Sequence, residues 1–206
     1  MARYLGPKMK ICRRLGVQLS DKAARFFAKR DIKEQRTTTT GRRKKKSQYG
    51  ERLEEKQKVK AFYGVLERQF RNYYRVASSQ PGNTGENLLQ LLERRLDNVV
   101  YRAGFANSRA QARQFIVHGH VRVNGEKVDV PSFLVEPEMI IAPAKSDKSK
   151  TLLNLFLDHT RSSHKPSWLE IADADGQTRA KVASMPTRDQ IELEVNEQLI
   201  VELLSR

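Results

Sequence analysis

Two arginines stand one helical turn apart in the stretch SRAQARQFIVHG, which covers residues 108–119. Ser108 and Gln111 have the spacing of a capping box, so the pattern predicts a helix that begins at Ser108. Arg109 and Arg113 would then lie on one face, beside a helix N-terminus whose N–H groups and dipole favour an anion. We therefore expect phosphate-binding chemistry in this stretch.

Cations from neighbouring stretches extend this basic face. Arg95 and Arg102 belong to the preceding helical pattern, and Arg122 and Lys127 belong to the stretch VRVNGEKV that follows. A small structural module with ordinary surface arginines is the alternative, but residues 98–125 contain no acid at all. Such a rigid surface would recognise the phosphates and the shape of a nucleic acid, and it offers no donors for base edges in a major groove. This kind of recognition suits folded RNA better than DNA.

Other kinds of chemistry lack the residues that they need. No glycine-rich loop of the phosphate-binding or dinucleotide type is present. Cys12 is the single cysteine, which excludes a four-ligand zinc site of cysteines and an intramolecular disulfide. His118 and His120 have no third metal ligand nearby, so we favour contacts of these histidines to RNA, or plain exposure, over a metal site. Asp173 and Asp175 suit a turn, where aspartates usually bind the backbone. We expect no enzyme, no cofactor and no metal.

The positive charge is concentrated at one end of the chain. The net charge is +15 over 206 residues, and residues 1–60 hold 20 Lys/Arg against 6 Asp/Glu. Such asymmetry indicates a polyanionic partner.

No apolar run is long enough to span a membrane, and the start MARYLGPKMKICRRLG lacks a signal-peptide core, so we expect neither a membrane span nor secretion. A basic amphipathic helix on a membrane surface over 8–30 is a weaker alternative, because positive charge surrounds its apolar residues.

Apolar periodicity predicts helices before the basic face. Apolar positions between residues 59 and 74 recur every three or four residues, which predicts a helix that Gly64 bends or divides. Aromatic residues at this spacing more often belong to a core than to a base-stacking surface. Arg52, Lys56 and Lys60 would form one cationic face. The stretch 31–50, with its threonines and its run of cations, is expected to be extended or disordered in the free protein.

A second stripe and a hairpin complete the expected module. Apolar residues from 88 to 103 predict a helix that ends at Gly104, and the residues at 112, 115 and 116 would face the core. Asn124-Gly125 between alternating strands predicts a type I′ turn, with the valines of the first strand on one face. We also expect a strand at 139–143, a helix at 151–160 and a strand-like or mixed segment at 190–204. The fold class is α+β.

The stretch RLDNVVYRAGFANSRAQARQFIVHGHVRVNGEKV resembles the RNA-binding domain that is named after small-subunit ribosomal protein S-four. The same module occurs in pseudouridine synthases, tyrosyl-tRNA synthetases and a heat-shock ribosome-binding protein, so the domain alone leaves the function open. The residues that carry the resemblance are Arg95-Leu96-Asp97, Ser108-Arg109, Ala112-Arg113, Gly119 and Val123-Asn124-Gly125.

Segments outside this module are similar to the bacterial-type S-four ribosomal protein family. They are MARYLGPKMKICRRLG, YGERLEEKQKVKAFYGVLERQFRNYY, GNTGENLL, PSWLE and NEQLIVELLSR. Because a modification enzyme would need a large catalytic domain after the module, and a free stress-response RNA chaperone would not need these segments, the resemblance favours the ribosomal family. A plastid-encoded member fits as well.

The resemblance implies a function in the small ribosomal subunit. Family members bind small-subunit ribosomal RNA (rRNA) directly and early in assembly, at a junction of several helices in the 5′ domain. They nucleate the body of the subunit, contact ribosomal protein S-five, influence translational accuracy and lie near the channel where messenger RNA (mRNA) enters. The implied location is the cytoplasm, with no membrane partner and no enzymatic activity.

The expected architecture is a mainly helical domain with an inserted small α/β RNA-binding module of two helices packed on a short hairpin sheet. We expect a basic N-terminal extension over 1–45, a helical domain over 46–90 that 158–206 completes, and the module over 91–157. The residues expected to contact rRNA are Arg3, Lys8, Lys10, Arg13, Arg14, Arg42, Arg43, Lys44, Lys45, Lys46, Tyr49, Arg52, Lys56, Lys58, Arg68, Arg71, Arg95, Ser108, Arg109, Arg113, His118, His120, Arg122 and Asn124.

Two stretches depart from the family pattern. Some relatives carry four cysteines near the N-terminus that bind zinc, and Cys12 matches one of them. Met9 stands where its partner three residues earlier would be, and no later cysteine follows. The stretch DIKEQRTTTTGRRKKKSQ also diverges, although it keeps its basic character. We therefore expect no zinc in this protein and assign residues in that stretch by charge alone.

Overall fold

The computed structural model describes residues 4, 6–19, 21–34, 47–144, 146, 149, 151, 166–174 and 177–205. The chain forms two compact units, one of residues 1–74 with 193–206 and the other of residues 75–192. The three-part domain division expected from the sequence stays a prediction.

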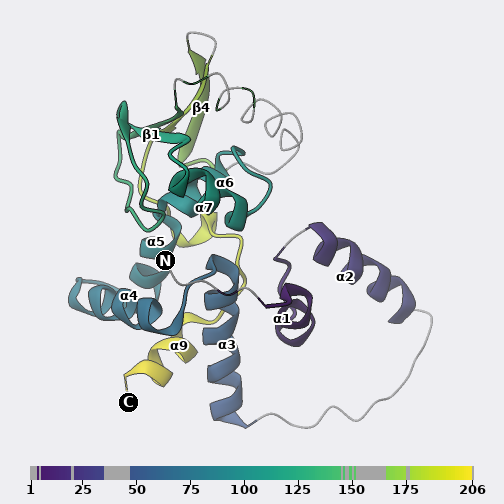
Figure 1. The fold of residues 1–206 in the computed structure, drawn as a ribbon. Coiled ribbons are helices and arrows are strands. Elements are labelled where there is room, and N and C mark those ends of the chain that lie inside the picture. The colour runs from purple at the N-terminus through teal and green to yellow at the C-terminus, as the bar shows by residue number, and fades with distance from the viewer. Residues whose placement is uncertain are drawn as a thin grey trace. The chain divides into compact units, whose positions relative to one another are not determined.

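The first unit is helical. It contains α1 (Lys8–Leu15), α2 (Asp21–Glu34), α3 (Gln48–Tyr63), the first part of α4 (Glu67–Ser79) and α9 (Glu197–Leu204). The C-terminal helix α9 packs beside α3, and α1 packs on α3 as well (Figure 1). The buried apolar residues of the unit include Cys12, Leu15, Val59, Phe70 and Ile200.

Helix α3 begins and ends at residues that suit helix termini. The hydroxyl of Ser47 accepts a hydrogen bond from the N–H of Gly50 at 3.2 Å, which caps the first turn. Gly64 takes a left-handed conformation with φ of 63°, and the helix ends there before α4 begins at Glu67. The prediction that Gly64 divides the helical stripe is confirmed.

The second unit combines helices with one antiparallel sheet. After α4 come α5 (Thr84–Glu93), α6 (Leu96–Arg102) and α7 (Arg109–Val117), and a short 3-10 helix, η1 (Arg188–Gln190), ends the unit. The strands are β1 (Val121–Val123), β2 (Glu126–Lys127), β3 (Ile140–Pro143), β4 (Leu169–Ala174) and β5 (Gln177–Val182), in the order β2-β1-β3-β5-β4. The predicted α+β class is confirmed.

One face of this sheet packs in the core of the second unit. Val123 of β1 pairs with Ile141 of β3, which pairs with Ala180 of β5, and all three side chains are buried. They belong to the same core cluster as Ala112 and Ile116 of α7. The alternation expected for β1 and the inward face expected for α7 are therefore confirmed. Figure 1 shows α6 and α7 next to the β1 side of the sheet.

The predicted hairpin turn is present. Asn124 and Gly125 both have positive φ, 51° and 85°, as a type I′ turn requires. The side-chain oxygen of Asn124 accepts a hydrogen bond from the N–H of Ile140 at 2.8 Å, so the turn is also tied to β3. The hairpin is thus held at its tip as well as along its strands.

The sheet is larger than the sequence indicated. Strands β4 and β5 form a long antiparallel pair beside β3, and neither strand was expected from the sequence. In the sequence, Asp175-Gly176 stands between the two strands, and this pair is typical of a two-residue hairpin loop. That signal was available in the sequence, and the interpretation of the aspartates as simple turn residues missed the two strands.

The second apolar stripe is two helices rather than one. Arg95 has extended backbone and forms an isolated β-bridge with Leu134. The N–H of Leu96 donates to the carbonyl of Phe133 at 2.8 Å, and the N–H of Val135 donates to that of Arg94 at 2.9 Å. Pairing with this later segment breaks the helix between α5 and α6, which periodicity alone could not indicate.

Two further expectations differ from the structure or concern residues that it does not describe. Residues 31–34 and 48–50 are helical, so the extended stretch expected at 31–50 is wrong at both ends, and its middle lies outside the described residues. The helix expected at 151–160 also lies outside them, apart from its first residue. The segment at 190–204 is mixed, as predicted, since α9 follows an irregular extended stretch. No helix in the described part of the chain combines the length and apolarity needed to cross a bilayer.

Candidate nucleic-acid interface

The start of α7 is built as the sequence predicts. The hydroxyl of Ser108 accepts a hydrogen bond from the N–H of Gln111 at 3.3 Å. The Gln111 side chain accepts from the N–H of Asn107 at 2.9 Å rather than from that of Ser108, so the capping box is shifted by one residue. The first turn of α7 contains no acid. Helix geometry and charge here favour an anionic partner.

Arg109 is fixed against α6 rather than extended into solvent. Its Nε donates to Oδ1 of Asn98 at 2.8 Å. Its guanidinium lies over the ring of Tyr101, with 4.6 Å between the guanidinium carbon and the ring centroid. The side chain is half-buried, so it presents a fixed cation with limited exposure.

Arg113 is bound to an acid from the preceding helix. Its Nε and Nη2 donate to Oδ2 of Asp97 at 3.0 and 2.6 Å. Arg95 donates to both oxygens of the same carboxylate, at 3.0 Å to Oδ1 and 2.7 Å to Oδ2. Arg95 and Asp97 are only 1 % and 2 % exposed. Arg95 and Arg113 were expected on an open basic face, and this expectation is wrong. Arg95 lies in the core, and Arg113 is paired with a buried acid.

Arg102 also lies in a buried ionic cluster. It contacts Glu93 at 3.2 Å and Glu192 at 2.5 Å. Glu93 accepts a further hydrogen bond from the Asn98 side chain. Because Asn98 in turn binds Arg109, this cluster is continuous with the start of α7. Two arginines of the acid-free stretch, Arg102 and Arg113, are therefore paired with acids from outside it.

The hairpin and the end of α7 carry polar groups that are exposed or half-buried. Arg122 donates to the carbonyl of Gly125 at 2.7 Å, and Lys127 beside it is exposed. The rings of His118 and His120 are stacked, and Nδ1 of His120 lies 2.9 Å from the hydroxyl of Ser149. Among the described residues no cluster of three or more His, Cys, Asp or Glu side chains could hold a metal ion.

In the first unit, α1 carries four cations that are open to solvent. Its exposed side chains are Lys8, Lys10, Arg13 and Arg14, while Cys12 faces inward and is fully buried. No acid occurs in the first twenty residues. Helix α1 therefore presents a basic face that no neighbouring acid of its own segment neutralises.

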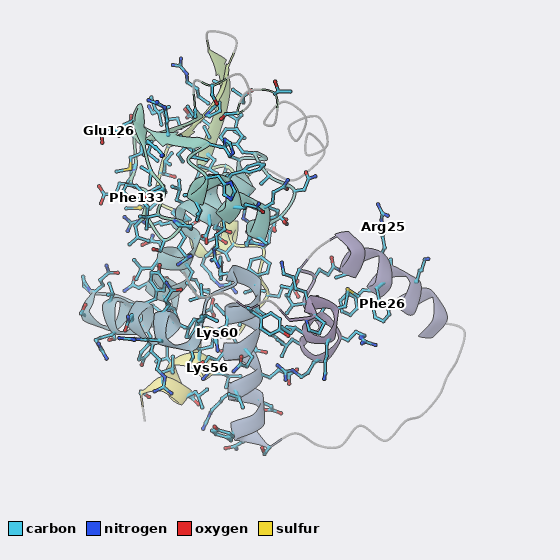
Figure 2. All side chains as sticks on the ribbon, in the orientation of Figure 1. Arg25, Phe26, Lys56, Lys60, Glu126 and Phe133 are labelled. Carbon is cyan, nitrogen blue, oxygen red and sulfur yellow. The ribbon has the colours of Figure 1, made fainter. Side chains whose placement is uncertain are left out.

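The expected cationic face of α3 is instead an ion-pair network. Lys56 and Lys60, which lie one turn apart on the helix (Figure 2), contact the carboxylate of Glu67 at 2.8 and 2.6 Å. Arg52 contacts Glu202 of α9 at 2.7 Å. Burial would raise the pKa of Glu67, but hydrogen bonds from Lys56 and then Lys60 outweigh burial and lower that pKa to about 2.

Other expected contact residues lie at different levels of exposure. Lys58 contacts Glu55 at 2.5 Å and Arg71 contacts Glu67 at 3.3 Å, whereas Arg68 and Tyr49 are exposed. Arg3 and the run at 42–46 lie outside the described residues. Two exposed cations of α2, Arg25 and Lys29, were not anticipated, and Figure 2 shows Arg25 directed away from the helix. Their spacing of four residues was the available signal.

A small sheet with two packed helices, together with a basic helical segment that contains no acid, is typical of a protein that binds a polyanion. The model of the S4 domain matches residues 94–141, and the model described as the ribosomal protein S4/S9 N-terminal domain matches residues 3–93. The chain belongs to the small ribosomal subunit protein uS4 family.

Relatives match along the whole chain. The sequence is 48% identical over 210 residues to the small ribosomal subunit protein uS4 of Pelotomaculum thermopropionicum. It is 49% identical over 211 residues to that of Clostridioides difficile and 45% identical over 206 residues to that of Pelodictyon phaeoclathratiforme. In each comparison the match covers 100% of both chains.

Proposed function

We propose that this protein is a structural constituent of the small ribosomal subunit and binds the rRNA of that subunit directly. The observation that carries the proposal is the similarity to uS4 proteins over 100% of both chains. A module shared with modification enzymes would match only part of such a chain. The family membership also supports a non-enzymatic role and a location in the cytoplasm, within the small subunit.

The electrostatics supports an RNA partner in particular. The net charge of +15 is concentrated in the N-terminal third of the chain, and the helix α1 exposes four cations. Binding to a phosphate backbone releases counterions from the RNA, and this release favours the complex at physiological salt. We infer that α1 makes phosphate contacts, and that it does so more directly than the ion-paired face of α3.

Further parts of the function follow from the resemblance. We place the RNA site at a junction of helices in the 5′ domain, where the protein would act as a primary binder and nucleate the body of the subunit. Ribosomal protein S-five is the proposed protein neighbour, and mRNA near the channel where it enters the ribosome is a proposed further contact. An influence on translational accuracy belongs to the same proposal.

A salt titration tests the RNA proposal at α1. Glutamine at Lys8, Lys10, Arg13 and Arg14 removes four exposed cations while leaving the buried side of the helix intact. Each lost phosphate contact lowers the log–log slope of affinity against salt by about 0.7 to 0.9, so the slope should fall by about 3. Filter binding with an rRNA fragment of the 5′ domain junction measures this slope.

The control is Lys181→Gln on β5, which removes a cation that contacts Glu138 at 2.7 Å. This variant should change the log–log slope by no more than the value of one phosphate contact, about 0.7 to 0.9. If the unchanged protein does not bind the fragment more tightly than an unrelated RNA of equal length, the proposed function is wrong. If it binds specifically and the α1 variant keeps its slope, RNA binding stands but α1 is not the contact.

A further inference from the structure

A single buried carboxylate joins the two helices of the sheet module. Asp97 lies in the first turn of α6 and accepts hydrogen bonds from Arg95, just before α6, and from Arg113 in α7. The Arg113 contacts are 3.0 and 2.6 Å long, both to Oδ2. The carboxylate of Asp97 therefore holds α7 to α6 through the side chain of Arg113.

The backbone around Asp97 is itself fixed. The N–H of Asp97 donates to the carbonyl of Pro131 at 3.1 Å, and the N–H of Leu96 donates to that of Phe133. The next residue, Asn98, accepts from Arg109 at the first position of α7. Two consecutive residues of α6 thus bind two arginines one turn apart on α7, which holds that face of α7 against α6.

The side of α7 that faces away from these contacts is open to solvent. Gln114 and His118 are exposed, and so is Asn107 immediately before the helix cap. The N–H groups of the first turn lie at the same end as Asn107. If α7 rotated or tilted, these groups would leave their positions together, because they belong to one short rigid helix.

We propose that Asp97 is a positioning residue for RNA binding: its carboxylate sets the orientation of α7, and RNA contacts the exposed side of that helix. The inference rests on the proposed function. Asp97 does not contact RNA itself, since it is 2 % exposed and carries the same sign of charge as phosphate. It acts through Arg113, whose role is to hold α7 rather than to bind a phosphate.

The sign of the effect separates this role from simple electrostatics. Asp97→Asn removes one negative charge, so a protein whose affinity depended on net charge alone would bind RNA more tightly. A role in stability alone would also leave affinity unreduced at a temperature where the variant is folded. Positioning predicts the opposite result, a weaker complex despite the more favourable charge.

The experiment measures the Kd of the full chain for the rRNA junction fragment, well below the midpoint of thermal unfolding. We expect Asp97→Asn to raise Kd by about tenfold or more, which corresponds to about 1.4 kcal/mol. The matched control Glu126→Gln removes the same charge at an exposed position on the hairpin, labelled in Figure 2, and should leave Kd unchanged or lower it. Circular dichroism at the assay temperature establishes that each variant is folded.

A second variant covers loss of folding by the first. Asp97→Glu keeps the charge and changes only the reach of the carboxylate, so it should weaken binding less than Asp97→Asn but measurably. Equal or tighter binding by a folded Asp97→Asn variant, or by Asp97→Glu if only that one folds, would overturn the proposal. Absence of specific binding by the unchanged protein would instead overturn the proposed function, so the two failures are distinct.

Discussion

Replacement of Glu67 by glutamine should destabilise the helical unit by an amount that depends on pH. Glu67 joins α4 to Lys56 and Lys60 of α3, and Lys56 is only 7 % exposed. A fall in pKa from 4.5 to about 2 corresponds to an upper limit of about 3 kcal/mol, at about 1.36 kcal/mol per pKa unit. Because the Glu67 side chain is 37% exposed, solvent screening reduces this contribution, and we expect about 1 to 1.5 kcal/mol.

The sign of the pH dependence follows from the lowered pKa. A carboxylate whose pKa is lower in the folded state contributes its full stability above the unfolded value of 4.5, and loses it as the pH falls towards 2. The difference between the unchanged protein and Glu67→Gln should therefore be largest near pH 7 and shrink below about pH 4.5.

Urea unfolding at pH 7, 5, 4 and 3 measures this difference. The control Glu194→Gln, at an exposed position of the same unit, should change stability by no more than about 0.5 kcal/mol at pH 7. A destabilisation by Glu67→Gln that stays constant across this pH range would refute the electrostatic explanation. If Glu67→Gln did not lower the stability at pH 7, the contacts of Glu67 with Lys56 and Lys60 would not stabilise the helical unit.

Three further predictions follow from the same structure. Arg113→Glu should lower the free energy of unfolding by at least about 2 kcal/mol, since it places a second carboxylate beside buried Asp97; a thermal melt that matches the unchanged protein would show that the pair contributes little. Deletion of residues 1–46 should flatten the salt dependence of RNA binding, measured by filter binding. It should also lower the unfolding temperature, because α1 packs on α3. Equal salt slopes for the full and the shortened protein would contradict phosphate contacts in this segment. Elemental analysis of the purified protein should find no stoichiometric zinc, and chelator should leave its melt unchanged; about one zinc per chain would contradict this.

Local signals in the sequence predicted several features correctly. Asn124-Gly125 predicts its turn because positive φ at both positions is a backbone requirement that few residues meet. Ser108 predicts the start of α7, and Gly64 the end of α3, because capping depends on a few adjacent atoms. Periodicity and turn signals also indicated the α+β class, whereas the family resemblance supplied the function, which local signals alone left open between several RNA-binding proteins.

The partners of the arginines could not be predicted from sequence spacing. Arg113 looks like a surface cation on a helix, and only the fold brings Asp97 to within 2.6 Å of it. Lys56 and Lys60 likewise meet Glu67 across a helix break, and Arg52 meets Glu202 from the far end of the chain. A count of charges gives the net field of a segment, but ion pairing depends on tertiary contacts between distant residues.

Sedimentation of ribosomal subunits tests the central claim most directly. Cell extract of the organism that makes this protein is resolved on a sucrose gradient after a wash in high salt, and the protein is detected in each fraction by mass spectrometry. A structural constituent that binds rRNA directly should sediment with the small subunit, in about one copy per subunit, and stay there after the wash. Its recovery only in the free fractions at the top of the gradient would contradict the account.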